Sequence, residues 1–177
     1  MARPTIDQIR GIADIAKTNR WNLKFLDAPA PLADLVGAGL ENPLNLLCST
    51  AEPPTQTINP DEVSIRGHKI FDPGDVEYNG TVTLTFYETG SNTVKSLFRQ
   101  WRELIRTSKS GVQAPRLDVQ ARVVLEQLNR QDERVYRYEI VGAWPTEFTA
   151  GEMNDEGAPL EHEATLQYDY FIDEALV

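Results

Sequence analysis

The sequence GTVTLTFYETGSNTVKSLFRQWRELIR, residues 80–106, decides the fold. In its first part, residues 81–87, apolar side chains alternate with threonine, which is the period of a strand that has one face on a core. After the turn-forming residues 88–92, apolar side chains recur at spacings of three and four over residues 94–105, which is the period of one helix face. A half-buried strand therefore leads into one amphipathic helix, and we expect the rest of the chain to supply strands for that helix to cover.

The ends and the faces of this helix are predicted by the same stretch. Ser91 or Asn92 is expected to cap the first turn, because both side chains accept hydrogen bonds from free backbone N–H groups. Trp101 lies in the apolar stripe and is predicted to be a core residue. Basic residues gather toward the C-terminal end, where the helix dipole favours cations. They are Lys95, Arg99, Arg102 and Arg106.

Several other segments have the pattern of strands. Gly67 is expected to mark a bulge or turn, Asp72–Asp75 a turn, Asn129–Asp132 the turn of a hairpin, and Gly142–Pro145 the end of a strand. The predicted class is mainly β, an antiparallel β-sandwich or partly closed barrel with one flanking α-helix and a short N-terminal helix. The expected strands are Trp21–Leu26, Leu44–Cys48, Pro60–Ile70 interrupted at Gly67, Val119–Glu126, Val135–Val141 and Ala164–Ile172.

Two segments near the N-terminus stand apart from this pattern. Residues 1–18 contain a narrow apolar stripe from Ile6 to Ala16 and are predicted to form an N-terminal helical arm. Residues 28–43 form a long loop with three prolines and two glycines, with one helical turn expected at Leu32–Val36. Loops of this length are uncommon unless they have a function. The segment is either a surface excursion or an arm that reaches a neighbouring subunit.

Composition limits the class of protein. The chain has 177 residues with 41% hydrophobic and 25% charged side chains, which suits one domain with a sizeable core. It has no apolar run near the ~18 residues of a membrane helix, and its N-terminus lacks the layout of a signal peptide. The single cysteine, Cys48, excludes an internal disulfide framework. The net charge of −10 disfavours a protein that grips nucleic acid through phosphates.

The sequence carries no pattern typical of catalysis. His68 and His162 lie far apart, and neither has a partner at metal-ligand spacing. Cys48 lies in an apolar run and is predicted to be a buried, inert thiol. The carboxylates of the 152–161 loop are expected to be solvated, with calcium coordination as the alternative, although the spacing of a known calcium loop is absent. No catalytic residue, metal or cofactor is therefore predicted, and a structural or interaction role is favoured.

Four segments, taken in order, resemble the tail tube proteins of contractile-tailed bacteriophages. The resemblance extends from Asn19 to Phe171, with weaker matches at Asn19–Leu23 and Leu46–Cys48. The loop of residues 28–43 is longer than the usual loop of that family. The chain could therefore be a subunit of the tube or of the baseplate tube. The four segments are Val63–Asp72 with the strand that follows it, the Phe98–Trp101 step of the helix, Ile140–Thr146, and Glu163–Phe171.

The resemblance implies one tail-tube-type domain over residues 1–177, with a β-barrel-like fold and a flanking helix. It implies rings of six copies that stack into the inner tube of a contractile tail, assembled in the host cytoplasm and located in the virion tail. The implied partners are further copies of the chain, the tail sheath protein, the baseplate tube and tail terminator proteins, and a tape-measure protein and genomic DNA in the lumen without specific binding. No membrane partner is implied.

Assembly into rings requires exposed strand edges and apolar side chains that contact neighbouring copies. Strands with open edges are prone to pair with neighbours, and rings stacked head to tail give an open filament. The second face of the last strand, with Phe171, and the Leu32–Leu40 loop are expected to offer apolar contacts. An acidic bore would repel DNA and speed its transit, with Asp75 and Glu77 as lumen candidates. The structural and assembly candidates are Gly67, Phe71, Trp101, Gly142, Trp144, Pro145, Tyr170 and Phe171.

Three alternatives remain open at this point. The basic helix face from Lys95 to Arg106 is either solvated or in contact with the sheath. The chain is either a tube subunit or a baseplate subunit that initiates the tube. From a different class of function, a metal-binding or hydrolytic module on the acidic loop would use Asp155 and Glu156.

Overall fold

The computed structural model describes residues 16–29, 32–33, 42–153 and 157–176. The predicted N-terminal helix and most of the 28–43 loop lie outside these residues. The elements, in chain order, are β1 Trp21–Leu26, α3 Pro43–Leu47, β2 Cys48–Ala51, β3 Gln56–Ile65, β4 His68–Tyr78, β5 Thr81–Tyr87, α4 Thr93–Ile105, the 3-10 turn η1 Arg116–Asp118, β6 Ala121–Leu128, β7 Arg134–Thr149, β8 Glu161–Gln167 and β9 Tyr170–Ala175.

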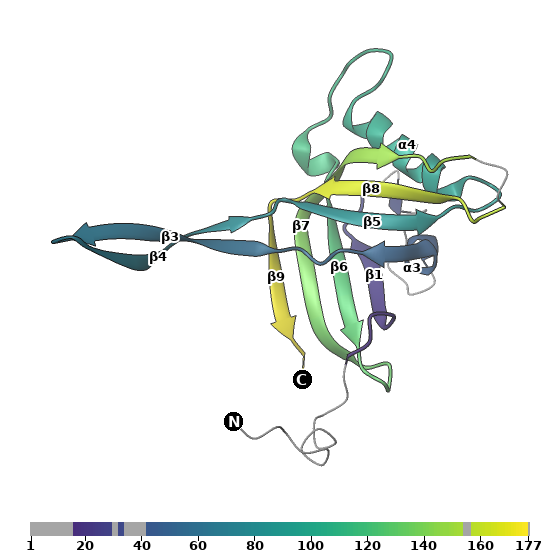
Figure 1. Ribbon diagram of the computed structural model, residues 1–177. Helices are drawn as coiled ribbons and strands as arrows, with labels where there is room; N and C mark the ends of the chain where they lie inside the picture. Colours follow the sequence, from purple (N-terminus) through teal and green to yellow (C-terminus); the bar gives the residue numbers. More distant parts are fainter. Residues whose placement is uncertain (1–15, 30–31, 34–41, 154–156, 177) are drawn as a thin grey trace.

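The main sheet is antiparallel and is organised around β7, the longest strand (Figure 1). The first half of β7 pairs with β6 on one side and β9 on the other, and β1 pairs with β6; we call these four strands sheet I. The second half of β7 pairs with β8, followed by β5 and β2; we call these strands sheet II. The prediction of a mainly β, antiparallel, sandwich-like fold is confirmed, and the sheet does not close into a barrel.

The core lies between the two sheets and under α4. The alternation predicted for residues 81–87 is confirmed, because Val82, Leu84 and Phe86 are all buried. Trp101 is 1% exposed, and its indole Nε1 donates a hydrogen bond of 2.8 Å to the carbonyl oxygen of Val119. That bond satisfies the polar atom of a large buried ring, so the predicted core position of Trp101 is confirmed.

Strands β3 and β4 form a separate two-stranded ribbon that projects far from the body (Figure 1); we call residues 56–78 the arm. Its tip is a two-residue turn at Arg66 and Gly67, both with positive φ, which matches the right-handed twist of a hairpin. The turn predicted at Gly67 is therefore confirmed. The turn predicted at Asp72–Asp75 is wrong, because these residues continue β4 through a register shift opposite Ile58–Pro60.

The predicted strand Leu44–Cys48 is wrong. Residues 43–47 form the short helix α3, and the strand begins only at Cys48. The Oδ1 atom of Asn42 accepts a hydrogen bond of 2.9 Å from the backbone N–H of Leu44, and Pro43 occupies the first helical position. An asparagine cap followed by proline starts a helix even where the apolar run has the length of a strand.

The predicted end of a strand at Gly142–Pro145 is also wrong, because β7 continues to Thr149. Gly142, with φ +75°, lies where β7 leaves its pairing with β6 and β9 and joins β8. The predicted last strand is two strands, interrupted at Tyr168 and Asp169. The interruption reverses the alternation, so that Phe171 is 8% exposed and belongs to the core.

In the part of the chain that the structure describes, no helix has both the length and the apolar character that crossing a membrane requires.

Candidate assembly surfaces

The arm exposes nearly all of its side chains. Only Gly74 is partly covered within β3 and β4, and an isolated two-stranded hairpin is marginally stable at best in water. At the base of the arm, the ring of Tyr78 packs edge-on against Phe171, with ring centroids 5.5 Å apart. Seven exposed apolar side chains on one hairpin indicate an interaction surface. They are Ile58, Val63, Ile65, Ile70, Phe71, Val76 and Tyr78.

The arm is also acidic. Asp61 and Asp72 are direct cross-strand partners, and no described cation lies within ion-pair distance of either carboxylate. Like charges that face each other across a ladder destabilise the pairing. Glu62, one position along, is paired with Lys69 at 2.7 Å. The predicted lumen residues Asp75 and Glu77 also lie on the arm, and Glu77 accepts a hydrogen bond of 3.1 Å from Asn59.

Several strand edges are open in the part of the chain that the structure describes. In sheet I, β1 pairs only with β6 and β9 pairs only with β7. In sheet II, β2 pairs only with β5. Open edges carry unpaired backbone N–H and C=O groups and accept a strand from another chain.

The face of sheet I that points away from the core carries a network of ion pairs. Glu126 is 3% exposed and lies between Lys24 at 2.7 Å and Arg134 at 3.2 Å. Glu139 lies between Arg122 at 3.0 Å and Arg137 at 2.6 Å. Asp27 lies 3.2 Å from Arg122 and Glu174 lies 3.8 Å from Arg137, so four acids meet four bases and this face is close to charge balance despite the net charge of the chain.

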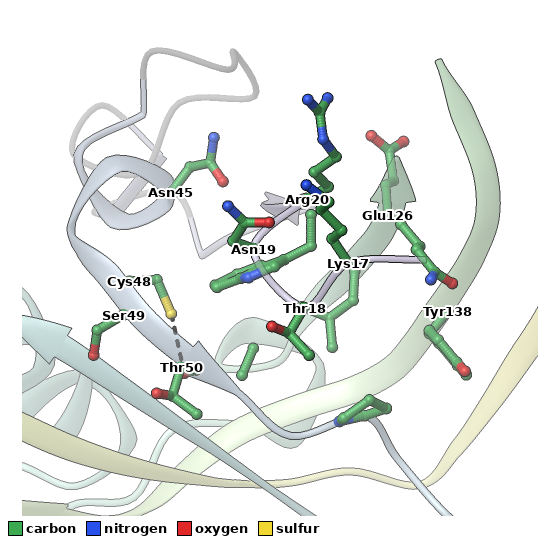
Figure 2. Close-up of a pocket in the computed structure, with 15 residues that line it drawn as sticks. Lys17, Thr18, Asn19, Arg20, Asn45, Cys48, Ser49, Thr50, Glu126 and Tyr138 are labelled. Carbon is green, nitrogen blue, oxygen red and sulfur yellow. Dashed lines mark hydrogen bonds between the residues drawn. The ribbon is translucent and has the colours of Figure 1, made fainter. Parts of the chain in front are cut away.

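A groove of about 800 Å³ lies between β1, β2 and β6 (Figure 2). Cys48 lies on its wall and donates a hydrogen bond of 3.4 Å from Sγ to the carbonyl oxygen of Thr50. Burial raises the pKa of the Cys48 thiol to about 12, so the thiol stays protonated at neutral pH. The prediction that Cys48 is fully buried is wrong, because its side chain is only partly buried. The raised pKa of the thiol is in line with the prediction that it is inert.

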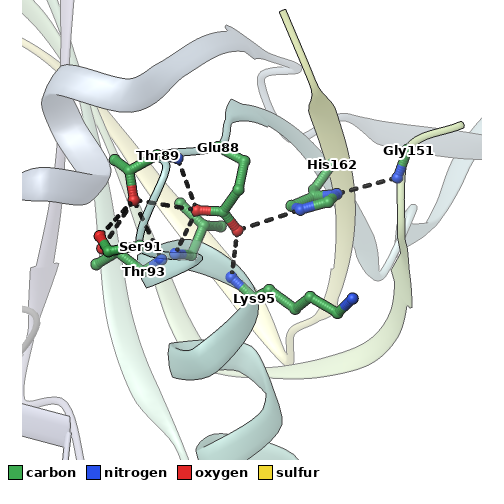
Figure 3. A network of polar contacts seen from close by, with 8 residues as sticks. Glu88, Thr89, Ser91, Thr93, Lys95, Gly151 and His162 are labelled. Carbon is green, nitrogen blue, oxygen red and sulfur yellow. Dashed lines mark hydrogen bonds and ion pairs between the residues drawn. The ribbon is translucent and has the colours of Figure 1, made fainter. Parts of the chain in front are cut away.

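A polar network fixes the start of α4 (Figure 3). The Glu88 carboxylate accepts hydrogen bonds from the backbone N–H groups of Thr89, Val94 and Lys95, at 2.8, 3.1 and 2.8 Å. Burial alone would raise the pKa of Glu88, but these hydrogen bonds and the nearby His162 outweigh it and hold the pKa below its ordinary value of 4.5. The predicted cap by Ser91 or Asn92 is wrong, because Asn92 at the N-cap has φ +55° and makes no capping hydrogen bond from its side chain.

A second groove of about 440 Å³ lies between α4 and the second half of β7; we call it the α4–β7 groove. The rings of Phe98 and Phe148 are stacked there with centroids 5.0 Å apart. Lys95, Arg99 and Arg102 are exposed along one side, at helical spacings of four and three that place them on one face. No described acid lies within ion-pair distance of these three cations, and the one acid that lines the groove is Glu147.

The predicted site residues lie in different environments. Gly67 and Phe71 lie on the arm, where Phe71 is 61% exposed. Trp144 and Pro145 are partly exposed on β7, and Tyr170 is 44% exposed on β9. The interpretation of Phe171 as an apolar contact on the surface is wrong, and so is that of Leu32, which is 1% exposed; the rest of the Leu32–Leu40 loop, except Ala33, lies outside the described residues.

The structure brings some of these residues together. Phe171 packs with Tyr78, Tyr138 and Tyr168. Gly142 lies against Asp169, whose carboxylate is paired with Arg116. Sequence reasoning missed the cap by Glu88, although a glutamate just before a turn and a helix start is a usable signal. It also missed the facing pair of Asp61 and Asp72, because the register of the hairpin was not predicted.

Groups of metal-ligating side chains are absent from the residues that the structure describes. His68 is exposed on the arm. Asp155 and Glu156, the residues of the metal-binding or hydrolytic alternative, lie outside the described residues.

The structure is similar to chains of several contractile assemblies. A chain of the extracellular contractile injection system PVC, from its sheath–tube complex in the extended state, gives a TM-score of 0.65 at 14% identity, covering 98% of this chain and 100% of that chain. A chain of the tube-terminating cap of the anti-feeding prophage gives 0.67 at 13% identity, covering 93% and 94%. A chain of that prophage's baseplate, solved with six-fold symmetry, gives 0.64 at 15% identity, covering 92% and 97%. These likenesses establish the fold.

Comparison with curated proteins found no match. The family model for phage tail tube proteins matches residues 16–174, which is nearly the whole chain. That family consists of structural proteins of the virion tail and not of enzymes, which removes the hydrolytic alternative. The chain therefore belongs to the phage tail tube protein family.

Proposed function

We propose that six copies of this chain form a ring, and that rings stack into the inner tube of a contractile phage tail through which DNA is delivered to the host. The whole chain then acts as one tube domain. The observation that carries the proposal is the arm, because a projecting hairpin with exposed apolar side chains needs cover that one copy does not supply. Because the chain belongs to the tail tube family, we expect neighbouring copies to cover the apolar side chains of the arm.

The open edges of sheet I support closure into a ring. When β1 of one copy pairs with β9 of the next, both edges are closed and the contact is head to tail. A head-to-tail contact generates a closed ring where the rotation fits. The ring size of six is in line with the six-fold symmetry of the similar baseplate assembly.

The acidic character of the chain supports passage of DNA through the lumen. A net charge of −10 repels phosphates, which keeps transit free of tight binding. Asp75 and Glu77 remain the proposed lumen acids. A tape-measure protein would occupy the same lumen before DNA is delivered.

Contacts with a sheath, a baseplate and a terminator belong to the same proposal. The similar chains come from a sheath–tube complex, a baseplate and a tube-terminating cap, which are the places in a contractile tail where such contacts occur.

A baseplate subunit that initiates the tube is the second candidate. The similarity to the baseplate chain, with a TM-score of 0.64, equals within 0.01 the similarity to the sheath–tube chain, with 0.65. Copy number separates the two functions, because an initiator occupies a single ring per particle whereas a tube protein occupies every ring. Quantitative mass spectrometry of purified particles measures that ratio directly.

Electron microscopy of the purified chain tests the proposal. We expect rings with six-fold symmetry, and tubes at high protein concentration. Persistent monomers at high concentration and across a range of salt would overturn it.

A further inference from the structure

The arm and the α4–β7 groove carry opposite charge and are both unpartnered. We infer that the arm of one copy seats in the α4–β7 groove of a neighbouring copy, with Asp61 and Asp72 facing Arg99 and Arg102. This contact rests on the proposed function and adds to it a specific pair of surfaces between copies.

One face of the arm carries both acidic and apolar side chains. Paired residues at alternate positions share a face of the ribbon, so Asp61 and Asp72 lie on the same face as the pair Val63 and Ile70. Val63 and Ile70 are 40% and 48% exposed. This face therefore presents an apolar patch beside two carboxylates that repel each other in the isolated chain. A partner that supplies both cations and an apolar surface would relieve the repulsion and cover the patch.

The α4–β7 groove carries cations beside aromatic side chains. Lys95, Arg99 and Arg102 follow one face of α4 beside the stacked rings of Phe98 and Phe148. Three cations stand against Glu147, so the groove is positive in a chain whose net charge is −10. The groove thus offers the cations that the face of the arm lacks. Its apolar surface comes from the partly exposed Pro145 and Phe148, because Phe98 is 2% exposed.

An arm does not reach the groove of its own chain. Figure 1 shows the arm projecting to one side of the body and away from α4, which lies along the top. A contact between two different surfaces on identical copies is head to tail, and such contacts build rings or open filaments. Both outcomes are compatible with a tube.

Charge reversal tests the contact. We expect Arg99→Glu with Arg102→Glu to reduce the assembled fraction by about tenfold or more, because like charges across an interface are strongly unfavourable. Asp61→Lys with Asp72→Lys should do the same. A mixture of the two variants should assemble again, since each reversed arm then meets a reversed groove and each native arm meets a native groove. Lys109→Glu and Glu152→Lys are matched controls that alter exposed charges elsewhere and should assemble as the native chain does.

A loss of assembly counts only for variants that are folded. Thermal unfolding of each variant in dilute solution establishes that the fold is kept. A groove variant that assembles as the native chain does would overturn the inference. So would an arm variant that assembles normally while the groove variant does not, because the groove would then bind something other than the arm.

Cysteine trapping separates the inference from the proposed function. In a Cys48→Ser background, one copy carries Asp72→Cys and the other carries Arg99→Cys, and oxidation should join them into a disulfide-linked pair on a non-reducing gel. Lys109→Cys in place of Arg99→Cys is the control and should give no pair. Trapped pairs without rings would support the contact and refute the tube, whereas rings without trapped pairs would do the reverse. Absence of both would overturn both.

Discussion

The imidazole Nε2 of His162 lies 3.1 Å from Oε2 of Glu88, and both side chains are buried (Figure 3). The Nδ1 atom of the same ring accepts a hydrogen bond of 3.0 Å from the backbone N–H of Gly151. A neutral ring therefore carries its proton on Nε2, facing the carboxylate. One side chain on β8 thus connects the start of α4 to the segment that follows β7.

The first prediction concerns the cap. Glu88→Gln removes the charge that receives the three backbone N–H groups at the start of α4. We expect the free energy of unfolding to fall by about 0.5–2 kcal/mol, the range for loss of a helix cap. Urea unfolding of the unassembled protein measures it. Glu161→Gln, an exposed glutamate at the start of β8, is the matched control and should have little effect.

The second prediction concerns pH. Because the pKa of Glu88 in the folded chain lies below its ordinary value of 4.5, the carboxylate contributes stability that is fully present above that value. This contribution is lost as the pH falls from about 4.5 through the folded pKa. Stability should therefore drop less steeply below pH 4.5 in Glu88→Gln than in the native chain. Identical slopes in the two proteins would show that Glu88 has the same pKa in the folded and unfolded chains.

The third prediction concerns the bend in β7. A Cβ atom at Gly142 would lie 2.3 Å from Oδ2 of Asp169, and the backbone there has φ +75°. Both the clash and the left-handed conformation oppose any side chain, so Gly142→Ala should destabilise the fold by about 1–3 kcal/mol. Gly90→Ala is the control, because its Cβ atom would meet nothing within 4 Å. Equal thermal midpoints for these two variants would contradict the prediction.

The regular parts of the fold could be predicted because local sequence alone sets their period. The strand at residues 81–87 and the stripe of α4 each have one face on the core, so the pattern and the structure agree. The family resemblance depended instead on four short segments in a fixed order, from Val63–Asp72 to Glu163–Phe171. The predictions failed where a cap or a bulge changes the path of the chain, as at Asn42 and at Asp72–Asp75.

The assembly surfaces could be predicted only in part. Phe71 and Tyr170 are exposed, but the reversal of alternation at Tyr168 moves Phe171 into the core. That reversal depends on the backbone at Asp169, which donates a hydrogen bond to the carbonyl oxygen of Val141 on β7. The opposition of Asp61 and Asp72 likewise depends on hairpin register, which period-two alternation does not determine when both faces of a ribbon are exposed.

The fourth prediction concerns Trp101. Trp101→Ala empties a packed site between α4 and β1 and should cost about 3–5 kcal/mol. Trp101→Phe keeps most of the apolar contacts but loses the hydrogen bond to Val119, and should cost less. Chemical denaturation of both variants separates packing from hydrogen bonding. A midpoint that does not move in Trp101→Ala would mean that the ring is not part of the core.

The fifth prediction concerns Cys48. Only a thiolate reacts readily with alkylating reagents, and burial raises the pKa of this thiol from 9.0 to about 12. The difference of three pKa units lowers the thiolate fraction near pH 8 by about a thousandfold relative to an ordinary cysteine. Alkylation of the folded chain, followed by mass spectrometry, should therefore be slower by that order, and urea should restore the ordinary rate. Rapid labelling of the folded protein would contradict a raised pKa of the Cys48 thiol.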